Sequence, residues 1–140
     1  MNAIPRRKGW SNVPVLINDR TQEVIASSVE LALTRQQRKR GLLGRDGIAH
    51  NAAMLISPCL AVHTVGLRFP IDVAFVDRDG VAVHLVHSLQ PWRLAGSARA
   101  HSVIEFPAGR LSSCGVKLGD RLFLDPAITP ERARAVKSSC

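Results

Sequence analysis

The fold is decided by the stretch Ile71-Asp-Val-Ala-Phe-Val-Asp-Arg-Asp-Gly-Val-Ala-Val-His-Leu-Val-His87. Two apolar runs, 71–77 and 81–87, flank Arg78-Asp79-Gly80, and a glycine-containing turn between two β-forming runs is a strong signal for a β-hairpin. Both runs are apolar at successive positions, so we expect both faces of the hairpin to be covered. The sequence therefore predicts a hairpin inside a β-sandwich or a closed barrel.

Further elements are predicted on both sides of this hairpin. Thr34 is a good N-cap for a short helix that ends near Leu43, and Pro107 suits the first position of a second helix that ends at Gly115. The segment 89–100 contains Pro91 and Gly96 and is predicted to be a loop. The predicted strands are 13–17 and 23–28, which form a hairpin, and 52–56, 60–64, 101–106 and 120–124. We therefore expect a mainly β chain, folded as a single compact sandwich- or barrel-like domain with one or two short helices.

Length and charge define the expected domain. The 140 residues are 46% hydrophobic and 21% charged, which is typical of one globular domain. Residues 1–40 carry eight Lys or Arg against three acidic residues, residues 41–130 carry eight against seven, and residues 131–140 carry three against one. We expect a basic flexible leader (1–12), a domain (13–125) and a flexible basic tail (126–140). The near-neutral middle and the absence of Tyr argue against nucleic-acid binding, which relies on basic grooves and aromatic stacking.

Targeting signals and metal-ligand patterns are missing from the sequence. No apolar run has the length of a signal peptide or of a membrane span, so we expect no membrane span. The three cysteines, Cys59, Cys114 and Cys140, are sparse and odd in number, unlike those of a secreted scaffold, and favour a cytoplasmic location. Cys59 and His63 lie four residues apart without further ligand pairs nearby, so we expect no metal site and no cofactor.

Charged side chains interrupt the apolar sequence between His63 and Asp72. A buried Asp72 would need hydrogen bonds from backbone amides or a cation such as Arg68 or Arg45. One interpretation is that Asp72 holds the loop 65–70 in place. The other is that Arg45, Arg68 and Asp72 bind a ligand.

His63, Asp72 and Glu105 are the candidate catalytic residues. His63 is a candidate base or ligand donor, although a lone histidine is more often satisfied within a core. Glu105 ends a predicted strand, where it either caps the amides of the next turn or pairs with Asp72 for acid and base work. The sequence contains no nucleophile elbow, phosphate-binding loop, dinucleotide fingerprint or zinc-protease motif.

Two functions remain open from the residues alone. The first is a binding or accessory module whose segments 41–45, 65–72 and 105–109 converge on a small polar or anionic ligand, or on a protein partner. The second is a hydrolase- or lyase-type enzyme that uses His63 with Asp72 or Glu105 as acid and base.

Four blocks of sequence follow one another in order: Arg40-Gly-Leu-Leu-Gly-Arg45, Arg68-Phe-Pro-Ile-Asp-Val-Ala-Phe-Val-Asp77, Glu105-Phe-Pro-Ala-Gly109 and Gly115-Val-Lys-Leu-Gly-Asp120. Together they resemble the DUF192 family of uncharacterised proteins. The resemblance spans about residues 13–124 and implies a compact, mainly β, sandwich- or barrel-like fold, with no established activity to carry over. Many relatives have a Trp-Met-Lys-Asn-Thr-like run where this chain has His63-Thr-Val-Gly-Leu67, so it looks like a variant with His-Thr at this place.

Overall fold

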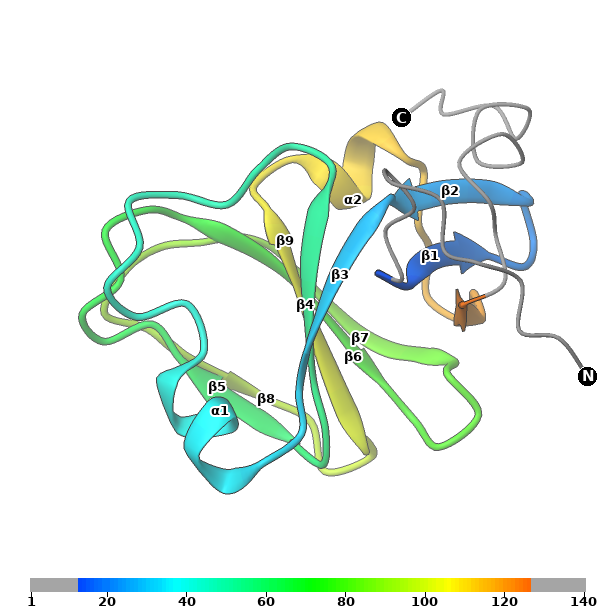
Figure 1. Ribbon diagram of the computed structural model, residues 1–140. Helices are drawn as coiled ribbons and strands as arrows, with labels where there is room; N and C mark the ends of the chain where they lie inside the picture. The colour runs from blue at the N-terminus through cyan, green and yellow to red at the C-terminus, as the bar shows by residue number, and fades with distance from the viewer. Residues whose placement is uncertain (1–12, 127–140) are drawn as a thin grey trace, which may run out of the picture.

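The computed structural model describes residues 13–126, which form three β-sheets and two short helices (Figure 1). This confirms the predicted mainly β class. Within these residues the sheets stack in layers and do not close into a barrel. The predicted leader 1–12 and the predicted tail beyond residue 126 lie outside the described residues.

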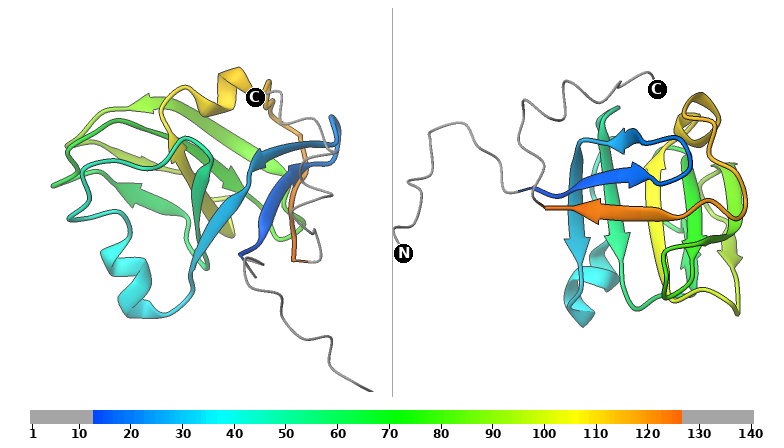
Figure 2. Two further views of the ribbon diagram at one scale, coloured as in Figure 1. Left: turned by 45° about the horizontal axis from the view of Figure 1, so that its top comes forward. Right: turned by 90° about the vertical axis from the view of Figure 1, so that its right-hand side faces the viewer.

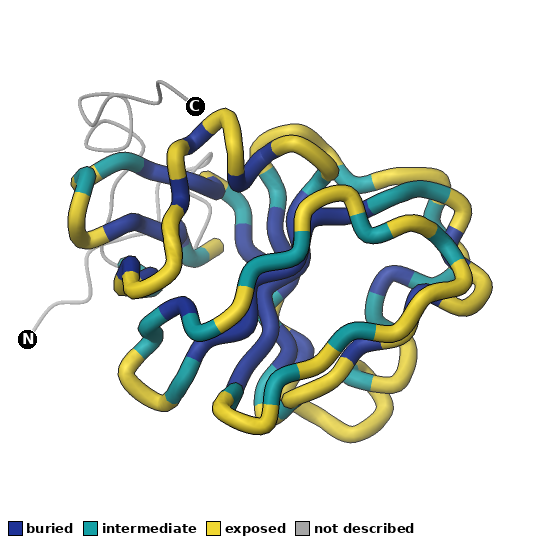
Figure 3. The backbone as a smooth tube through the Cα atoms, turned by 180° about the vertical axis from the view of Figure 1, so that it is seen from behind, coloured by how far each residue is buried: buried dark blue, intermediate teal, exposed yellow. Residues whose placement is uncertain are grey.

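A five-stranded sheet lies at the centre of the fold. Neighbouring strands in it are antiparallel, except that β3 (Ser28–Ala32) and β4 (Ala52–Ile56) are parallel. Figure 3 shows that the buried backbone positions concentrate in the middle of the molecule, where these strands run. In spatial order the strands are β3 (Ser28–Ala32), β4 (Ala52–Ile56), β9 (Ser102–Pro107), β6 (Ile71–Val76) and β7 (Ala82–Leu89).

The predicted central hairpin is confirmed as β6 and β7. Gly80 in its turn has φ +82°, and a Cβ at this position would lie 2.5 Å from the carbonyl oxygen of Leu122, so only glycine fits. Every residue of β6 is buried, as expected. The expectation that the second strand is covered on both faces was wrong, because β7 is an edge strand and most of its residues are at least partly exposed.

One face of the central sheet packs against a second sheet. This sheet has the order β10 (Leu122–Asp125), β1 (Val15–Asn18) and β2 (Glu23–Ala26), and it contains the predicted N-terminal hairpin. Its strands run across those of the central sheet (Figure 2, right). Helix α2 (Arg110–Ser113) adds to the same core, whose largest buried side chains are Leu16, Ile25, Phe106 and Leu111.

The other face of the central sheet is covered by irregular chain and a small third sheet. This sheet pairs β5 (Ala61–His63) with β8 (Leu94–Gly96), and helix α1 (Arg35–Arg40) lies beside it (Figure 1). The predicted cap is confirmed, because Thr34 and Gln37 form a capping box at the start of α1. The apolar side chains on this side include Leu42, Met54, Val62, Phe75 and Val103.

Three elements differ from the sequence prediction. Pro107 is the last residue of β9, and α2 begins three residues later, after Gly109 turns the chain with φ +89°. β8 falls within the predicted loop 89–100. β3 was not predicted because the chain leaves the β1–β2 sheet and joins the central sheet after only one residue, Ser27.

Candidate functional site

Strand β9 places Glu105 on the face of the central sheet that is covered by α1 and β5. Its direct neighbours across the two ladders are Met54 on β4 and Val73 on β6, and directly opposed residues share a face of the sheet. Glu105 is 6% exposed. The carboxyl group therefore lies among apolar side chains.

One carboxylate oxygen of Glu105 has no partner in the described part of the chain. Oε2 is buried and accepts no hydrogen bond from any of residues 13–126. Burial raises the pKa of Glu105 from 4.5 to about 7, although the positive charge of Arg45 acts in the opposite direction. The group can therefore gain or lose a proton near neutral pH.

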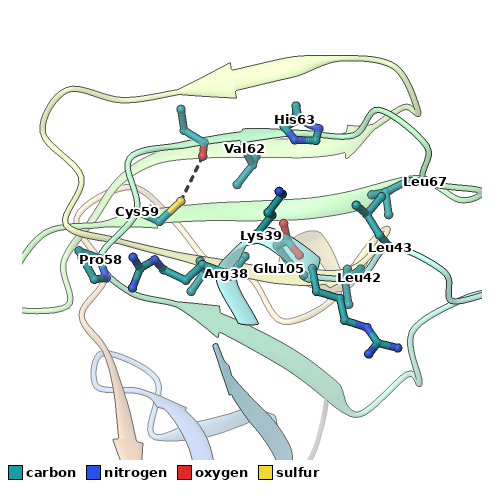
Figure 4. Close-up of a pocket in the computed structure, with 14 residues that line it drawn as sticks. Arg38, Lys39, Leu42, Leu43, Pro58, Cys59, Val62, His63, Leu67 and Glu105 are labelled. Atoms are coloured by element: carbon teal, nitrogen blue, oxygen red, sulfur yellow. Dashed lines mark hydrogen bonds between the residues drawn. The ribbon is translucent and has the colours of Figure 1, made fainter. Parts of the chain in front are cut away.

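Glu105 faces a pocket with a volume of about 140 Å³, which we call the Glu105 pocket. In Figure 4 its carboxylate lies at the centre of the lining side chains. Most of the wall is apolar, and besides Glu105 its polar members are one histidine, one cysteine and three consecutive basic residues. The lining residues are Arg38, Lys39, Arg40, Gly41, Leu42, Leu43, Ile56, Pro58, Cys59, Ala61, Val62, His63, Leu67 and Glu105.

Local sequence explains how α1 comes to border the pocket. The helix has no buried residue, so its capping box stabilises it in place of a packed face: Thr34 Oγ1 accepts from the Gln37 amide at 3.1 Å, and Gln37 Oε1 accepts from the Thr34 amide at 3.1 Å. Gly41 ends the helix with φ +47°, and the chain then turns so that Leu42 enters the core. Three cations are thus left at the border of the pocket, just before a buried leucine.

His63 and Cys59 also line the pocket. His63 lies on β5 and is exposed. The Cys59 thiol donates to the carbonyl oxygen of Ala61 at 3.1 Å, and burial raises its pKa, so it stays protonated near neutral pH. The structure thus brings two of the candidate catalytic residues, His63 and Glu105, to one pocket. Within residues 13–126, no group of three or more His, Cys, Asp or Glu residues is arranged to hold a metal ion.

Asp72, the third candidate, projects from the opposite face of the central sheet. It is directly opposed to Phe106, one residue along from Glu105, so the two carboxylates point in opposite directions. Asp72 is fully buried, and its oxygens accept from the amides of Ser88 at 2.8 Å and Leu111 at 2.9 Å. It joins β6 to β7 and α2, and among the described residues it pairs with neither Glu105 nor a cation.

Arg68 and Arg45 each pair with a surface carboxylate. Arg68 bonds Asp46 at 2.7 Å with both side chains largely exposed, and Arg45 makes two hydrogen bonds to Glu30, at 2.9 and 2.6 Å. The predicted ligand-binding set of Arg45, Arg68 and Asp72 is therefore not gathered in one place. The three predicted segments do meet at the Glu105 pocket, however, through Gly41–Leu43, Leu67 and Glu105.

Sequence reasoning did not identify the basic border of the pocket or the contribution of Cys59, Ala61 and Val62 to its wall. A signal for the first was present, because Arg35-Gln-Gln-Arg-Lys-Arg40 holds four cations and no acid. Such a run is usually a solvated face, and only the packing of β5 beside α1 gives it a neighbouring pocket.

None of the helices within residues 13–126 has the length and apolar character needed to cross a membrane.

Comparison with known proteins identifies relatives of uncharacterised function. The model of the DUF192 family, described as "Uncharacterized ACR", matches residues 16–124. No curated protein matches the chain.

Two crystal structures share the fold. One is a protein from Sinorhizobium meliloti 1021 described as a candidate transcription regulator, with TM-score 0.71 and 26% identity, covering 81% of this chain and 92% of that one. The other is a protein of unknown function from Novosphingobium aromaticivorans DSM 12444, with TM-score 0.70 and 22% identity, covering 86% of this chain and 91% of that one. The family match spans most of the chain, from β1 to β10. The chain therefore belongs to the DUF192 family.

Proposed function

We propose that this domain binds a small polar or anionic ligand in the Glu105 pocket. The observation that carries the proposal is the buried Oε2 atom of Glu105, which has no hydrogen-bond partner within residues 13–126. Leaving a buried polar group unsatisfied costs about 1–3 kcal/mol, and more when the group is charged. A ligand that supplies the missing hydrogen bond would offset this cost.

The rest of the pocket supports the same proposal. Small-molecule sites are concave and mostly apolar, with a few polar groups that fix orientation, and here those groups are Glu105, His63 and the basic end of α1. A volume of about 140 Å³ exceeds the roughly 30 Å³ that one water occupies in the liquid, so the pocket has room for a small molecule.

One observation favours a second candidate, an enzyme that uses acid and base catalysis. Glu105 has its pKa raised to about 7, which suits a group that must both give and take a proton near neutral pH. His63 lines the same pocket and could act as its partner. A hydrolase or lyase of this kind would rely on His63 and Glu105 without Asp72, which faces the other side of the sheet.

Thermal-shift measurements with sugars, phosphates and carboxylates test the binding proposal. A ligand at 100 times its Kd adds about 2.7 kcal/mol of stability, so the wild-type Tm should rise by several degrees. Glu105→Ala should lose this shift, and His63→Ala should weaken it. His87→Ala is the matched control, because His87 is exposed on β7 away from the pocket.

The same variants separate binding from catalysis. If the domain is an enzyme, His63→Ala should lower turnover of a ligand that still binds with unchanged affinity. The binding proposal fails if no compound changes the Tm in a concentration-dependent way, or if Glu105→Ala responds as the wild type does.

A further inference from the structure

We propose that the ligand of the Glu105 pocket is a small organic acid with a short apolar chain, bound as its carboxylate against the carboxyl group of Glu105. This inference rests on the proposed function and names its ligand class. Three features of the pocket carry it: the sign of the charges around it, the missing partner of Oε2 and the apolar wall.

The charges around the pocket select an anion. Arg38, Lys39 and Arg40 line one side of it, and Arg45 is close enough to act electrostatically on Glu105. Glu105 is the only acidic residue of the lining, and it is buried. A cationic ligand would have to pass this basic border, whereas an anion is attracted by it.

The unpaired Oε2 atom of Glu105 determines which hydrogen-bonding group the anion needs, namely an acceptor for the Glu105 proton. A protonated Glu105 is a hydrogen-bond donor, and an O–H to carboxylate hydrogen bond is short and strong because one partner is charged. The two carboxyl groups would share one proton, as like-charged carboxyls do when they are forced together. A single negative charge on the ligand is therefore matched to a single proton on Glu105.

The proposed complex uses a second hydrogen-bond donor, a backbone amide of strand β5. The residues that flank β5 bond to the residues that flank β8. The carbonyl oxygen of Leu60 accepts from the Ser97 amide, and the Thr64 amide donates to the carbonyl oxygen of Arg93. Because antiparallel pairing alternates, the amide groups of Ala61 and His63 point away from β8. Both residues line the pocket, and the Ala61 carbonyl oxygen on this edge of β5 accepts a hydrogen bond from Cys59, another lining residue. In the proposed complex the His63 amide on the same edge donates to the second oxygen of the carboxylate.

The remaining wall selects an apolar chain. Leu42, Ile56 and Val62 belong to the buried cluster on this face of the sheet, and Leu43 packs against them. A polyol placed there would leave hydroxyl groups without partners, which costs more than burying methylene groups. A chain of a few carbons fits both the chemistry of this wall and a volume of about 140 Å³.

We expect ligand binding to take up a proton at high pH. The titratable and charged groups that line the pocket with Glu105 are Cys59, whose thiol stays protonated, His63 and the three cations at the end of α1, and Arg45 acts on Glu105 electrostatically. Glu105 loses its proton as the pH rises through about 7, and an ionised Glu105 repels a carboxylate. Affinity should therefore fall about tenfold for each pH unit above that value.

Isothermal titration calorimetry with pentanoate is the test, with pentanamide and pentylamine as matched probes. Pentanoate should bind at about pH 6 and about 30-fold more weakly at about pH 8.5, with uptake of about one proton per ligand at the higher pH. Proton uptake is measured by repeating the titration in two buffers that differ in ionisation enthalpy. Pentylamine should not bind, and pentanamide should bind more weakly than pentanoate at the lower pH.

Glu105→Gln gives the sharpest arm of this experiment. Glutamine offers an N–H donor at every pH, so pentanoate should bind this variant with pH-independent affinity, without proton uptake and at least about tenfold more tightly than it binds the wild type at about pH 8.5. If Glu105 had only a structural role, Glu105→Gln would not bind pentanoate more tightly than the wild type does at high pH. His87→Ala should behave as the wild type does. If Glu105→Gln fails to fold by circular dichroism, proton uptake by the wild type decides.

Two failures can be told apart. If pentylamine or pentanamide binds more tightly than pentanoate, or if pentanoate binds without proton uptake at high pH, the ligand class is wrong while the pocket remains a binding site. If neither these probes nor the sugars and phosphates bind at millimolar concentration, both the ligand class and the proposed binding function are wrong.

Discussion

Replacing Asp72 with alanine should lower the free energy of unfolding by about 4 kcal/mol, because a hydrogen bond to a charged group contributes about 1.5–3 kcal/mol and this carboxylate accepts two. The donors, the amides of Ser88 and Leu111, belong to β7 and α2, and Asp72 is fully buried between them. No water can replace the lost acceptor without a cavity that admits it. Urea denaturation followed by circular dichroism measures the change.

Two further variants calibrate this prediction. Asp72→Asn keeps one acceptor oxygen but faces the second amide with its own N–H, so it should cost about half as much as Asp72→Ala. Asp46→Ala is the control, because that carboxylate is 90% exposed and its bond to Arg68 should contribute less than about 1 kcal/mol. A loss of under about 1 kcal/mol in Asp72→Ala would contradict the structural role assigned here.

Much of the sheet could be predicted from sequence because its signals are local. The Arg78-Asp79-Gly80 turn between two apolar runs identified β6 and β7, and Thr34 followed by Gln37 marked the start of α1. β8 escaped prediction because it has only three residues and owes its conformation to β5, a distant partner in sequence. Such short strands carry no periodicity of their own.

The site was predictable in its residues but not in their grouping. Glu105 stands out as a lone acid in Val103-Ile-Glu-Phe106, and the sequence predicted Glu105, His63 and Asp72 together as candidate catalytic residues. The register between β6 and β9 decides that Asp72 and Glu105 lie on opposite faces, and a shift of one residue would have reversed this. Register depends on the whole sheet, which is why spacing alone could not separate a structural carboxylate from one in a pocket.

Glu105→Gln should make the protein more stable than the wild type above neutral pH. The folded-state pKa of Glu105 is raised from 4.5 to about 7, so the wild type loses stability as the pH rises between these two values. At 1.36 kcal/mol per pKa unit the loss approaches about 3 kcal/mol and is complete above the folded-state pKa. Glutamine carries no charge, and the variant avoids this loss.

The measurement is the difference in unfolding free energy between variant and wild type from about pH 4 to about pH 8. The difference should grow by about 3 kcal/mol in favour of the variant, while Asp46→Asn, at an exposed position, should stay within about 0.5 kcal/mol of the wild type. A constant difference for Glu105→Gln across this range would contradict the prediction.

A buried acid that destabilises the fold at neutral pH is characteristic of a functional site. Residues kept for binding or catalysis often reduce stability, and replacing them often increases it. Asp72 and Glu105 illustrate the contrast within one sheet. The first has an amide for each oxygen, and the second has an oxygen with no partner within residues 13–126 and a pocket in front of it.

The central claim, that Glu105 is a protonatable group at the wall of a ligand pocket, is tested most directly by NMR titration of its side-chain carboxyl carbon. Glutamate labelled with ¹³C at the carboxyl carbon, with Glu105→Gln to assign the signal, allows the group to be followed from acid to alkaline pH. We predict a midpoint of about 7 in the free protein, which should rise when pentanoate is added. A midpoint near the ordinary glutamate value of 4.5 would contradict the account.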